Sequence, residues 1–298
     1  VMEPIFEQEF CQYSYGFRPH RSCKDAPRRV DGLLKQGYKY VVDADIKGYF
    51  DNIPQDKLMQ LVEDKIADSR VLKLLKQYLS QQVIDTMASW TPEAGTPQGA
   101  VISPLLANIY LNPLDWLMLD KGYEMTRYAD DFVVMCQAKE QAEEALETIK
   151  MWTEEAGLIL HPSKTKIVCA DYESFDFLGY KFTQGIKYPS EKSFKKFRDN
   201  IRRHTRRCNG KSLEHIIATL KPIQRGWFEY FKHSHKYTFS GQDKWIRRRL
   251  RSILKKREKR SGISTIGYDH IRFPNSTFDN CGFFSMVKAH RELCQSLK

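Results

Sequence analysis

Two adjacent carboxylates, Asp130 and Asp131, are the residues of this chain with the clearest potential for chemistry. They lie between two segments with the composition of β-strands, Glu124–Arg127 and Phe132–Cys136. Strands joined by a tight Ala-Asp turn form a hairpin, and the turn carries the acids out of the hydrogen-bonded ladder. Acids in that position can hold a cation, although an Asp-Asp pair can also be a solvated turn with no further role.

A third carboxylate, Asp45, stands at the end of an apolar segment that begins at Tyr40. A glycine and aromatic residues follow it, so the pattern predicts a strand that ends near Asp45. Carboxylates from separate strands suit Mg²⁺, which prefers carboxylate and phosphate oxygens and is often shared with substrate phosphates. Two such ions, about 3.5–4 Å apart, stabilise the attacking and leaving oxygens of an in-line displacement. Three clustered acids also raise one another's pKa, and a bound metal ion resolves that conflict.

Further motifs accompany these acids along most of the chain. They are Ser14-Tyr15-Gly16-Phe17-Arg18-Pro19, Gly95-Thr96-Pro97-Gln98-Gly99 with Ser103-Pro104, Tyr128-Ala129-Asp130-Asp131, His161-Pro162-Ser163-Lys164 and Phe177-Leu178-Gly179-Tyr180. In these motifs and in their order, the chain resembles the group II intron reverse transcriptases, which are RNA-directed DNA polymerases that also act as splicing maturases. The resemblance implies an α+β fold: a right-hand polymerase palm whose antiparallel sheet carries the acids, a partial fingers region and an all-helical basic thumb.

The resemblance also implies roles for the residues around the acids. Asp45, Asp130 and Asp131 would hold two Mg²⁺ ions, with the Ile46 carbonyl close by. Phe50, five positions after Asp45, matches the aromatic residue with which this family excludes a ribose 2′-hydroxyl. Core packing is the alternative role for that ring.

Further positions match the family's contacts with nucleotide and primer. Gln98, Gly99 and Tyr128 match residues near the incoming nucleotide, where a glycine permits close backbone approach; Gly99 can equally be an ordinary turn residue. Lys164 matches a lysine near the leaving pyrophosphate that donates a proton or neutralises charge, and a solvated surface lysine is the alternative. Gly179 belongs to the motif that resembles the primer grip, for which a buried apolar strand is the alternative.

The net charge of +11 is unevenly distributed. From Gly185 to Lys298 there are 28 Lys and Arg against 9 Asp and Glu, an excess of +19, so the preceding residues carry −8. A region this basic attracts phosphates, and binding through it weakens as salt rises. We expect RNA or template–primer contacts from the fingers and from this basic part, at Arg18, Arg21, Arg247, Arg248, Arg251 and Lys255.

Helix patterns dominate the basic part. Three helices are predicted, Glu191–Arg207, Ser212–Tyr230 and Gly241–Arg260, with breaks at Asn209-Gly210 and Ser240-Gly241. The spacing of Ile246, Leu250 and Leu254 places them on one face, so the basic residues between them fall on other faces. The aromatic residues Trp227, Phe228 and Tyr230 favour core packing over stacking on bases.

One further helix is predicted behind the catalytic hairpin. Ser103 and Pro104 have the types of an N-cap and a first helical residue. Pro113 lacks a backbone donor and should kink or end that helix.

The length of 298 residues and a hydrophobic content of 41% fit two or three subdomains. We expect partial fingers at about 1–38 and 57–98, palm at about 39–56 and 99–184, and a thumb or maturase-specific domain at 185–298. Since the first residues match a point inside the family's fingers, the N-terminal part of the fingers is expected to be missing. No endonuclease-like segment follows the thumb, so cleavage of target DNA is not expected.

The sequence shows neither a signal peptide nor an apolar run of about 18 residues, so a cytoplasmic protein is expected, in a bacterium or an organelle matrix, without a membrane partner. The 7 cysteines form no C-x-x-C pair, which disfavours a disulfide framework, and most are expected to be small buried hydrophobes.

The expected reaction is Mg²⁺-dependent addition of deoxynucleotides to a primer 3′-hydroxyl on an RNA template, combined with intron RNA binding and a splicing role. The expected partners are intron RNA, a template–primer duplex, a DNA primer and deoxynucleotide triphosphates. Two alternatives stay open. One is a catalytically impaired RNA-binding maturase, or a fragment without the N-terminal fingers. The other is a domesticated bacterial reverse transcriptase, for example one that serves in phage defence.

Overall fold

A computed structural model describes residues 2–80, 83–85, 88–90, 94–96, 100–264 and 267–296. The chain divides into two compact units. The first comprises Val1–Leu178 with Thr183–Gly185, and the second comprises Gly179–Phe182 with Ile186–Lys298.

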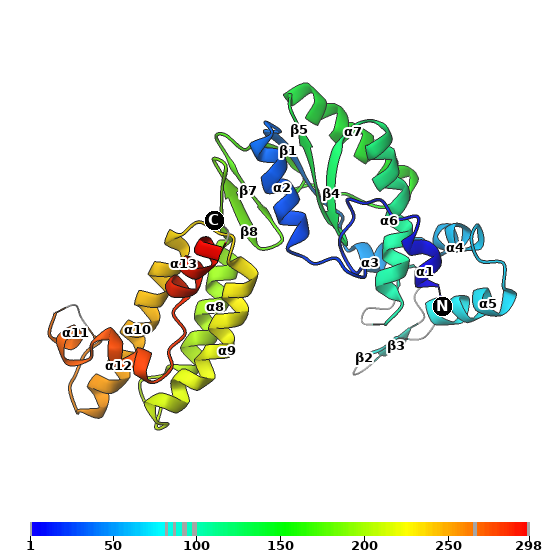
Figure 1. Ribbon diagram of the computed structural model, residues 1–298. Helices are drawn as coiled ribbons and strands as arrows, with labels where there is room; N and C mark the ends of the chain where they lie inside the picture. The colour runs from blue at the N-terminus through cyan, green and yellow to red at the C-terminus, as the bar shows by residue number, and fades with distance from the viewer. Residues whose placement is uncertain are drawn as a thin grey trace. The chain divides into compact units, whose positions relative to one another are not determined.

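A four-stranded antiparallel sheet is the centre of the first unit (Figure 1). Its order is β4 (Glu124–Tyr128), β5 (Asp131–Cys136), β1 (Tyr40–Asp45) and β6 (Lys166–Cys169). The hairpin expected from the sequence is therefore confirmed, with each of its strands one residue longer at the turn. The strand expected to end at Asp45 is confirmed as well.

The two faces of this sheet have different characters. Val42 and Ala44 of β1 are buried in the main core, to which helices α6 (Ser103–Asp120) and α7 (Lys139–Glu155) also contribute. Successive side chains of a strand point to opposite faces, so Asp43 and Asp45 face away from that core. The register is well determined because a slip by one residue would turn the acids toward the main core.

Helix α6 differs from the sequence prediction at its N-cap, and of the two outcomes expected at Pro113, a kink or an end, the end is excluded. Its N-cap is Ile102, and Ser103 is its first residue, so the N-cap prediction was wrong by one position. The helix does not end at Pro113 but continues to Asp120. Leu111 and Leu114, on either side of the proline, are fully buried, and burial of such side chains outweighs one lost hydrogen bond.

The other helices and strands of the first unit are shorter. β2 and β3 pair with each other in an antiparallel ribbon. The bounds are α1 (Glu3–Glu7), α2 (Asp25–Lys35), α3 (Tyr49–Asn52), α4 (Gln55–Glu63), α5 (Ser69–Leu79), β2 (Val83–Asp85) and β3 (Ala88–Trp90).

A second, three-stranded sheet has the order β7 (Ser174–Phe177), β8 (Tyr180–Thr183) and β9 (Ile186–Pro189). Leu178 and Gly179 form the turn between β7 and β8, and both have positive φ, 48° and 77°. Two successive residues with positive φ are typical of the tight turn that joins antiparallel strands. The hairpin expected at the primer-grip motif is present.

The second unit is mostly helical. Its long helices are α8 (Glu191–His204), α9 (Leu213–Phe231) and α10 (Tyr237–Arg257). They are followed by the shorter α11 (Tyr268–Arg272), α12 (Asn275–Asn280) and α13 (Met286–Ser296). The α+β fold with an antiparallel palm sheet and a helical basic part is therefore confirmed.

The break expected at Ser240-Gly241 was wrong, because α10 begins at Tyr237 and runs through this pair. Phe239 is fully buried in the core of the second unit. Its burial stabilises the first turn by more than the roughly 1 kcal/mol that a helical glycine costs. The break at Asn209-Gly210 is confirmed, and Ser212 caps α9 by accepting a hydrogen bond from the His215 amide at 3.2 Å.

Aromatic packing fills the core of the second unit. Trp227 stacks on Phe197 with ring centroids 4.5 Å apart, and Phe228 contacts Phe239 edge to face at 5.2 Å. Ile246 and Leu250 are fully buried on the face predicted for them. Core packing is thus the role of Trp227 and Phe228.

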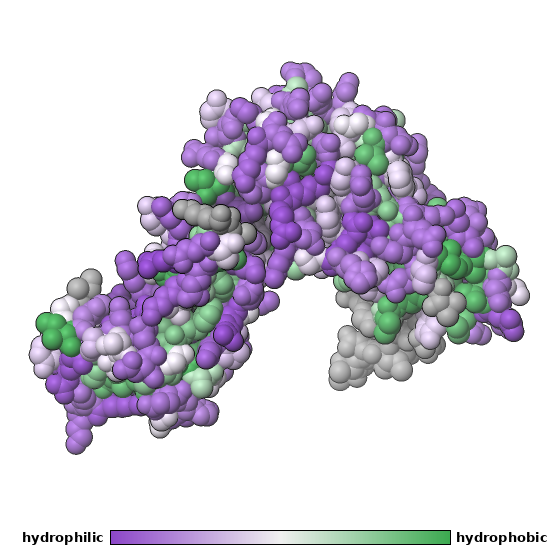
Figure 2. Space-filling model, in the orientation of Figure 1, coloured by the Kyte–Doolittle hydropathy of each residue, from purple (hydrophilic) through white to green (hydrophobic). Residues whose placement is uncertain are grey.

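The cysteines are all free thiols, and only Cys11 and Cys136 are buried, so the expectation that most would be buried was wrong. Among the described residues no helix is both long and apolar enough to cross a membrane. The face of the molecule in view in Figure 2 is largely hydrophilic, with smaller hydrophobic areas.

Candidate functional site

The register of the four-stranded sheet brings the predicted acids together. Asp45 at the end of β1 is directly paired with Asp131 at the start of β5, and Asp131 is also paired with Tyr128 across the hairpin. Paired residues on adjacent strands carry their side chains on the same face. Ala129 and Asp130 form the turn, so Asp130 adjoins the pair.

The protein environment makes these carboxyl groups harder to ionise. Desolvation raises the pKa of Asp130, and the charge of Asp45 adds to that effect. Asp131 is exposed as a whole residue, yet many protein atoms surround its carboxyl group, and this desolvation raises its pKa to about 7. The neighbouring charge of Asp43 is the next contribution to that rise.

Asp43 is a fourth acid of this face that the sequence analysis missed. Desolvation raises its pKa to about 6, Lys166 opposes the rise, and Asp176 and Asp45 add to it. Its spacing of two residues from Asp45 was the available signal, because positions i and i+2 of a strand share a face.

Lys164 is brought to the acids by the segment that follows α7. The amide of His161 donates a hydrogen bond to the Asp45 carbonyl at 2.7 Å, which holds this segment against the end of β1. The Lys164 ammonium group then forms an ion pair with Asp45 Oδ2. The hydrogen bond between the Lys164 ammonium and Asp45 raises the pKa of Lys164, so the side chain stays charged beside the acids.

The acids have the donor chemistry of a Mg²⁺ site, since all the side chains involved are carboxylates. As arranged here, no three His, Cys, Asp or Glu side chains of the described residues form a group that could hold a metal ion. The Asp45 carboxylate is directed to the Lys164 ammonium, which is the cation beside it. Two other features fit the binding of a divalent ion. The pKa values of Asp130 and Asp131 are raised, and part of this rise comes from the clustering of like charges, which a bound cation would relieve.

An aromatic group borders the acids. Phe50 is half-buried against the core and contacts Tyr49, with ring centroids 5.6 Å apart. Phe17, which is 50% exposed, lies between Phe50 at 6.5 Å and Tyr128 at 6.2 Å. The structure therefore joins Phe50 and Tyr128 through a third ring that the sequence analysis did not single out. Gln98 and Gly99 lie outside the described residues.

The two arginines expected to bind RNA from the fingers have internal partners. The Arg18 side chain is 3% exposed, pairs with Glu7, and donates to the carbonyls of Cys11 at 2.6 Å and Ser14 at 3.0 Å. A guanidinium enclosed in this way cannot reach a phosphate, so the assignment of Arg18 to RNA is corrected to a structural role. Arg21 is half-buried and donates to the Ser14 carbonyl at 3.3 Å.

The expectation that the α10 side chains are free for phosphates also needs correction. Arg251 is 2% exposed and donates to the Phe273 carbonyl at 2.8 Å and to Asn275 Oδ1 at 2.7 Å. Arg247 and Lys255 form ion pairs with Asp279 and Asp269, with side chains that are 11% and 14% exposed. These three side chains join α10 to the segments that follow it. Arg248 alone of the four predicted residues is exposed.

A different basic surface surrounds Trp245 of α10. The guanidinium groups of Arg198, Arg202 and Arg249 lie 5.4–5.8 Å from the centre of its ring. A cavity of about 290 Å³ adjoins the ring and is lined by Arg207, Arg248 and Arg249, among others. We call Trp245, Arg198, Arg202, Arg248 and Arg249 the Trp245 surface. Its arginines come from α8 and α10, so no single helical pattern of the sequence reveals it.

Gly179 has a defined structural requirement in the second unit. Its φ is 77°, and an added Cβ would lie 3.0 Å from Ser193 Oγ. Its carbonyl accepts hydrogen bonds from the Ser190 amide at 2.8 Å and from Ser193 Oγ at 3.0 Å. The turn is thereby fixed to the start of α8.

Comparison with known proteins agrees with this architecture. Residues 1–182 match the reverse transcriptase (RNA-dependent DNA polymerase) family, and residues 194–268 match the group II intron, maturase-specific domain. The solved structure of apo telomerase from Candida tropicalis has a similar fold: its TM-score is 0.52 at 13% sequence identity, over 85% of this chain and 54% of the telomerase chain.

Two curated relatives show how much of a longer protein the similarity spans. The group II intron-encoded protein LtrA of Lactococcus lactis is 40% identical over 127 residues, which cover 43% of this chain and 21% of LtrA. Protein YkfC of Escherichia coli is 32% identical over 220 residues, which cover 61% of this chain and 58% of YkfC. The chain thus spans less than two thirds of the length of either relative. The match over residues 1–182, together with the paired acids of the antiparallel sheet, shows that the chain belongs to the reverse transcriptase (RNA-dependent DNA polymerase) family and carries a group II intron maturase-specific domain.

Proposed function

We propose that this protein extends a primer with deoxynucleotides on an RNA template, and that Mg²⁺ is the metal of the reaction. The observation that carries this proposal is the register in which Asp45 is paired with Asp131 next to the turn residue Asp130. In-line phosphoryl transfer needs positioning and charge stabilisation, and carboxylates on rigid strands supply both through a metal.

The proposed roles follow from the chemistry of each side chain. Asp45, Asp130 and Asp131 would hold Mg²⁺, which when bound stabilises the charge that develops on the phosphate oxygens. Lys164 would release Asp45 to the metal and direct its ammonium at the leaving pyrophosphate. Phe50, supported by Phe17, would form the wall against the nucleotide sugar.

RNA binding is assigned to the second unit. Its match to the maturase-specific domain, the charge excess of +19 from Gly185 onward and the Trp245 surface support intron RNA as the partner. Arginines around an aromatic ring provide phosphate pairing and base stacking together. The similarity to LtrA, a group II intron-encoded protein, is in keeping with this proposal.

The decisive experiment replaces the turn acid. Asp130→Asn keeps the size of the side chain but removes its charge, so we expect primer extension with Mg²⁺ to fall by at least about 100-fold while RNA affinity stays within about 2-fold. Asp64→Asn, at an exposed position after α4, is the matched control and should retain both properties. The proposal fails if the wild-type protein binds RNA tightly but extends no primer.

That outcome would favour the second candidate, an RNA-binding maturase without polymerase activity. The ion pair of Asp45 with Lys164 is the observation in its favour, because a carboxylate held by an internal cation is less available to a metal. Measurement of primer extension together with Mn²⁺ binding by the wild-type protein separates the two candidates.

A further inference from the structure

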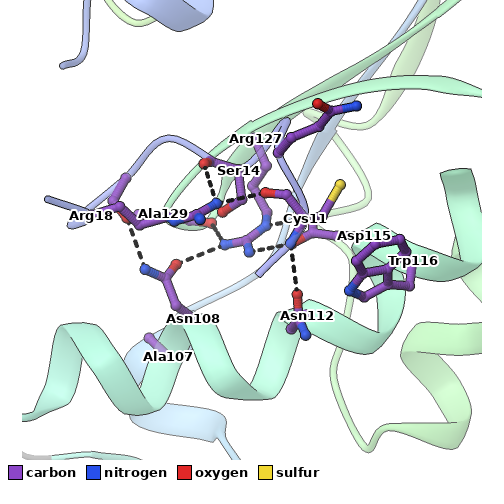
Figure 3. A network of polar contacts seen from close by, with 12 residues as sticks. Cys11, Ser14, Arg18, Ala107, Asn108, Asn112, Asp115, Trp116, Arg127 and Ala129 are labelled. Carbon is purple, nitrogen blue, oxygen red and sulfur yellow. Dashed lines mark hydrogen bonds and ion pairs between the residues drawn. The ribbon is translucent and has the colours of Figure 1, made fainter. Parts of the chain in front are cut away.

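Arg127 connects the catalytic turn to the interior of the first unit (Figure 3). Its side chain is 1% exposed. Nε donates to Asp115 Oδ1 at 2.7 Å, and Nη2 pairs with Asp115 Oδ2. Nη1 donates both to Asn108 Oδ1 at 3.0 Å and to the Ala129 carbonyl at 2.9 Å. One guanidinium therefore joins two residues of α6 to the residue that precedes Asp130.

The burial of this group makes its geometry well determined. A buried charge is tolerated only when it is paired and its donors are satisfied. Asp115 is also buried, which raises its pKa, and the charge of Arg127 opposes that rise. Because Asp115 and Asn108 lie on the same long helix, the partners of Arg127 are held on a rigid element.

The Ala129 contact acts directly on Asp130. Ala129 has φ of 58°, a left-handed conformation that costs a non-glycine residue about 1–2 kcal/mol and needs support from its surroundings. The Ala129 carbonyl and the Asp130 amide belong to one planar peptide group. A hydrogen bond that fixes this carbonyl therefore also fixes the plane from which the Asp130 side chain departs.

A segment near the N-terminus supports the turn from another side. The Arg127 amide donates to the Tyr13 carbonyl at 3.0 Å, and the Tyr15 amide donates to the Arg127 carbonyl at 2.8 Å. Asn108 Nδ2 donates to the Gly16 carbonyl at 2.8 Å. A Cβ at Gly16 would lie only 2.3 Å from the Ala129 amide nitrogen, so this contact requires glycine.

We propose that Arg127, Asn108 and Gly16 are positioning residues that set the direction of Asp130 toward the metal and the substrate phosphates. The inference rests on the proposed function, since only that function assigns a metal to Asp130. It gives the Ser14-Tyr15-Gly16-Phe17 motif a role at the catalytic turn in addition to any role in the fingers.

Three variants with two matched controls test this inference. Arg127→Lys keeps the charge but cannot reach Asp115, Asn108 and Ala129 at once. Asn108→Ala removes a link while the Arg127–Asp115 pair remains, and Asn112→Ala is its control, four residues along the same helix, where the side chain contacts Cys11 and Glu9. Gly16→Ala introduces the crowded Cβ, and its control is Gly32→Ala in α2, where a Cβ meets nothing within 4 Å.

The measurements are Mn²⁺ affinity by electron paramagnetic resonance, primer-extension kcat and KM per folded molecule, and the thermal midpoint. We expect each test variant to weaken Mn²⁺ binding by at least about 3-fold and to lower kcat by about 10- to 100-fold, with KM for the nucleotide within about 2-fold. The controls should match the wild type in Mn²⁺ affinity and kcat.

A purely structural role predicts a different result, namely lower thermal midpoints with wild-type Mn²⁺ affinity and kcat in the molecules that remain folded. That result would overturn the inference. If Arg127→Lys does not fold, Asn108→Ala and Gly16→Ala decide the question. A wild-type protein that binds Mn²⁺ but extends no primer contradicts the proposed function, whereas the Mn²⁺ comparison among the variants still tests the positioning role.

Discussion

The acids of the four-stranded sheet repel one another, and Asp43 contributes to this repulsion without any assigned contact with substrate. Its pKa is raised to about 6 because the carboxyl group is desolvated, so the folded protein holds this proton more tightly than the unfolded chain does. The free energy of unfolding therefore falls as pH rises from about 4 to about 6, and this loss persists above pH 6.

Asp43→Asn should remove that pH dependence. In buffer with EDTA we compare the free energy of unfolding of the variant with that of the wild type. We expect this difference to favour the variant by about 1–2 kcal/mol more at pH 8 than at pH 4.5, after allowing for solvent screening of a partly exposed group. The measurement is the thermal midpoint at both pH values, with a relative gain of about 2–6 °C. An equal difference between variant and wild type at both pH values would contradict this account.

Under the proposed function, Lys164 would compete with a metal ion for Asp45, with which it forms an ion pair. In Lys164→Met the ammonium is gone, so the electrostatic competition at this carboxylate is removed and Mn²⁺ should bind about 2- to 10-fold more tightly. Primer extension should nevertheless fall, since the variant loses the charge that the proposed function directs at the leaving pyrophosphate. Calorimetric titration with Mn²⁺ is the check; weaker binding in the variant would show that Lys164 supports the metal site.

Among the helices, α10 shows how a basic pattern can serve internal packing. Ile246 and Leu250 were predicted correctly because their spacing follows the helical period. The environment of Arg251 was not predictable, since its partners Phe273 and Asn275 lie in a segment more than 20 residues later. A long arginine can be drawn inward wherever carbonyls of a distant loop accept its donors, and helix periodicity carries no signal for that.

Arg251→Ala should therefore act on stability. We expect a loss of about 2–4 kcal/mol in the free energy of unfolding of the second unit, because buried carbonyl and amide groups lose their donors. RNA affinity per folded molecule should stay within about 2-fold. Chemical denaturation and RNA titration provide the comparison with Arg203→Ala, an exposed arginine of α8 that should be nearly neutral. If the variant lost RNA affinity at unchanged stability, Arg251 would have to contact a phosphate of the RNA, as the sequence analysis expected.

The palm strands and the catalytic hairpin were the most predictable elements. Their signals are local: an apolar run that ends at Asp45, and segments of strand-like composition on both sides of the Asp130 turn, of which Phe132–Cys136 is apolar throughout. By contrast, Pro113 and Gly241 lie inside helices, because burial of neighbouring side chains overrides the local preference of each residue. The network around Arg127 could not be predicted, since it includes Tyr13 and Gly16, which lie about 100 residues before their partners Arg127 and Asn108.

Across the whole molecule, the charge separation between the chain's two parts should govern RNA affinity. The excess of +19 from Gly185 onward predicts that the logarithm of the association constant falls linearly with the logarithm of salt concentration. The residues before Gly185 carry −8, so they repel phosphates on balance. The salt dependence should therefore come from the second unit.

The Trp245 surface should supply a measurable share of that slope. Replacing Arg202 and Arg248 together by alanine should reduce the slope by about 2, one unit for each lost phosphate contact. Arg291→Ala, on α13, is the control and should leave the slope unchanged. RNA titrations at several salt concentrations give the slopes. An unchanged slope in the double variant would show that RNA binds to another surface.

The hydrogen bond from Asn108 to Gly16 also has a consequence for how the protein folds. It joins residues 92 positions apart, so the catalytic turn gains its full support only after a long loop has closed. Closing such a loop costs chain entropy before the contact can repay it, and structures rich in distant contacts fold slowly. A ribosome must therefore release the hairpin whose turn carries Asp130 before the first residues can dock, and the nascent chain remains catalytically immature until then.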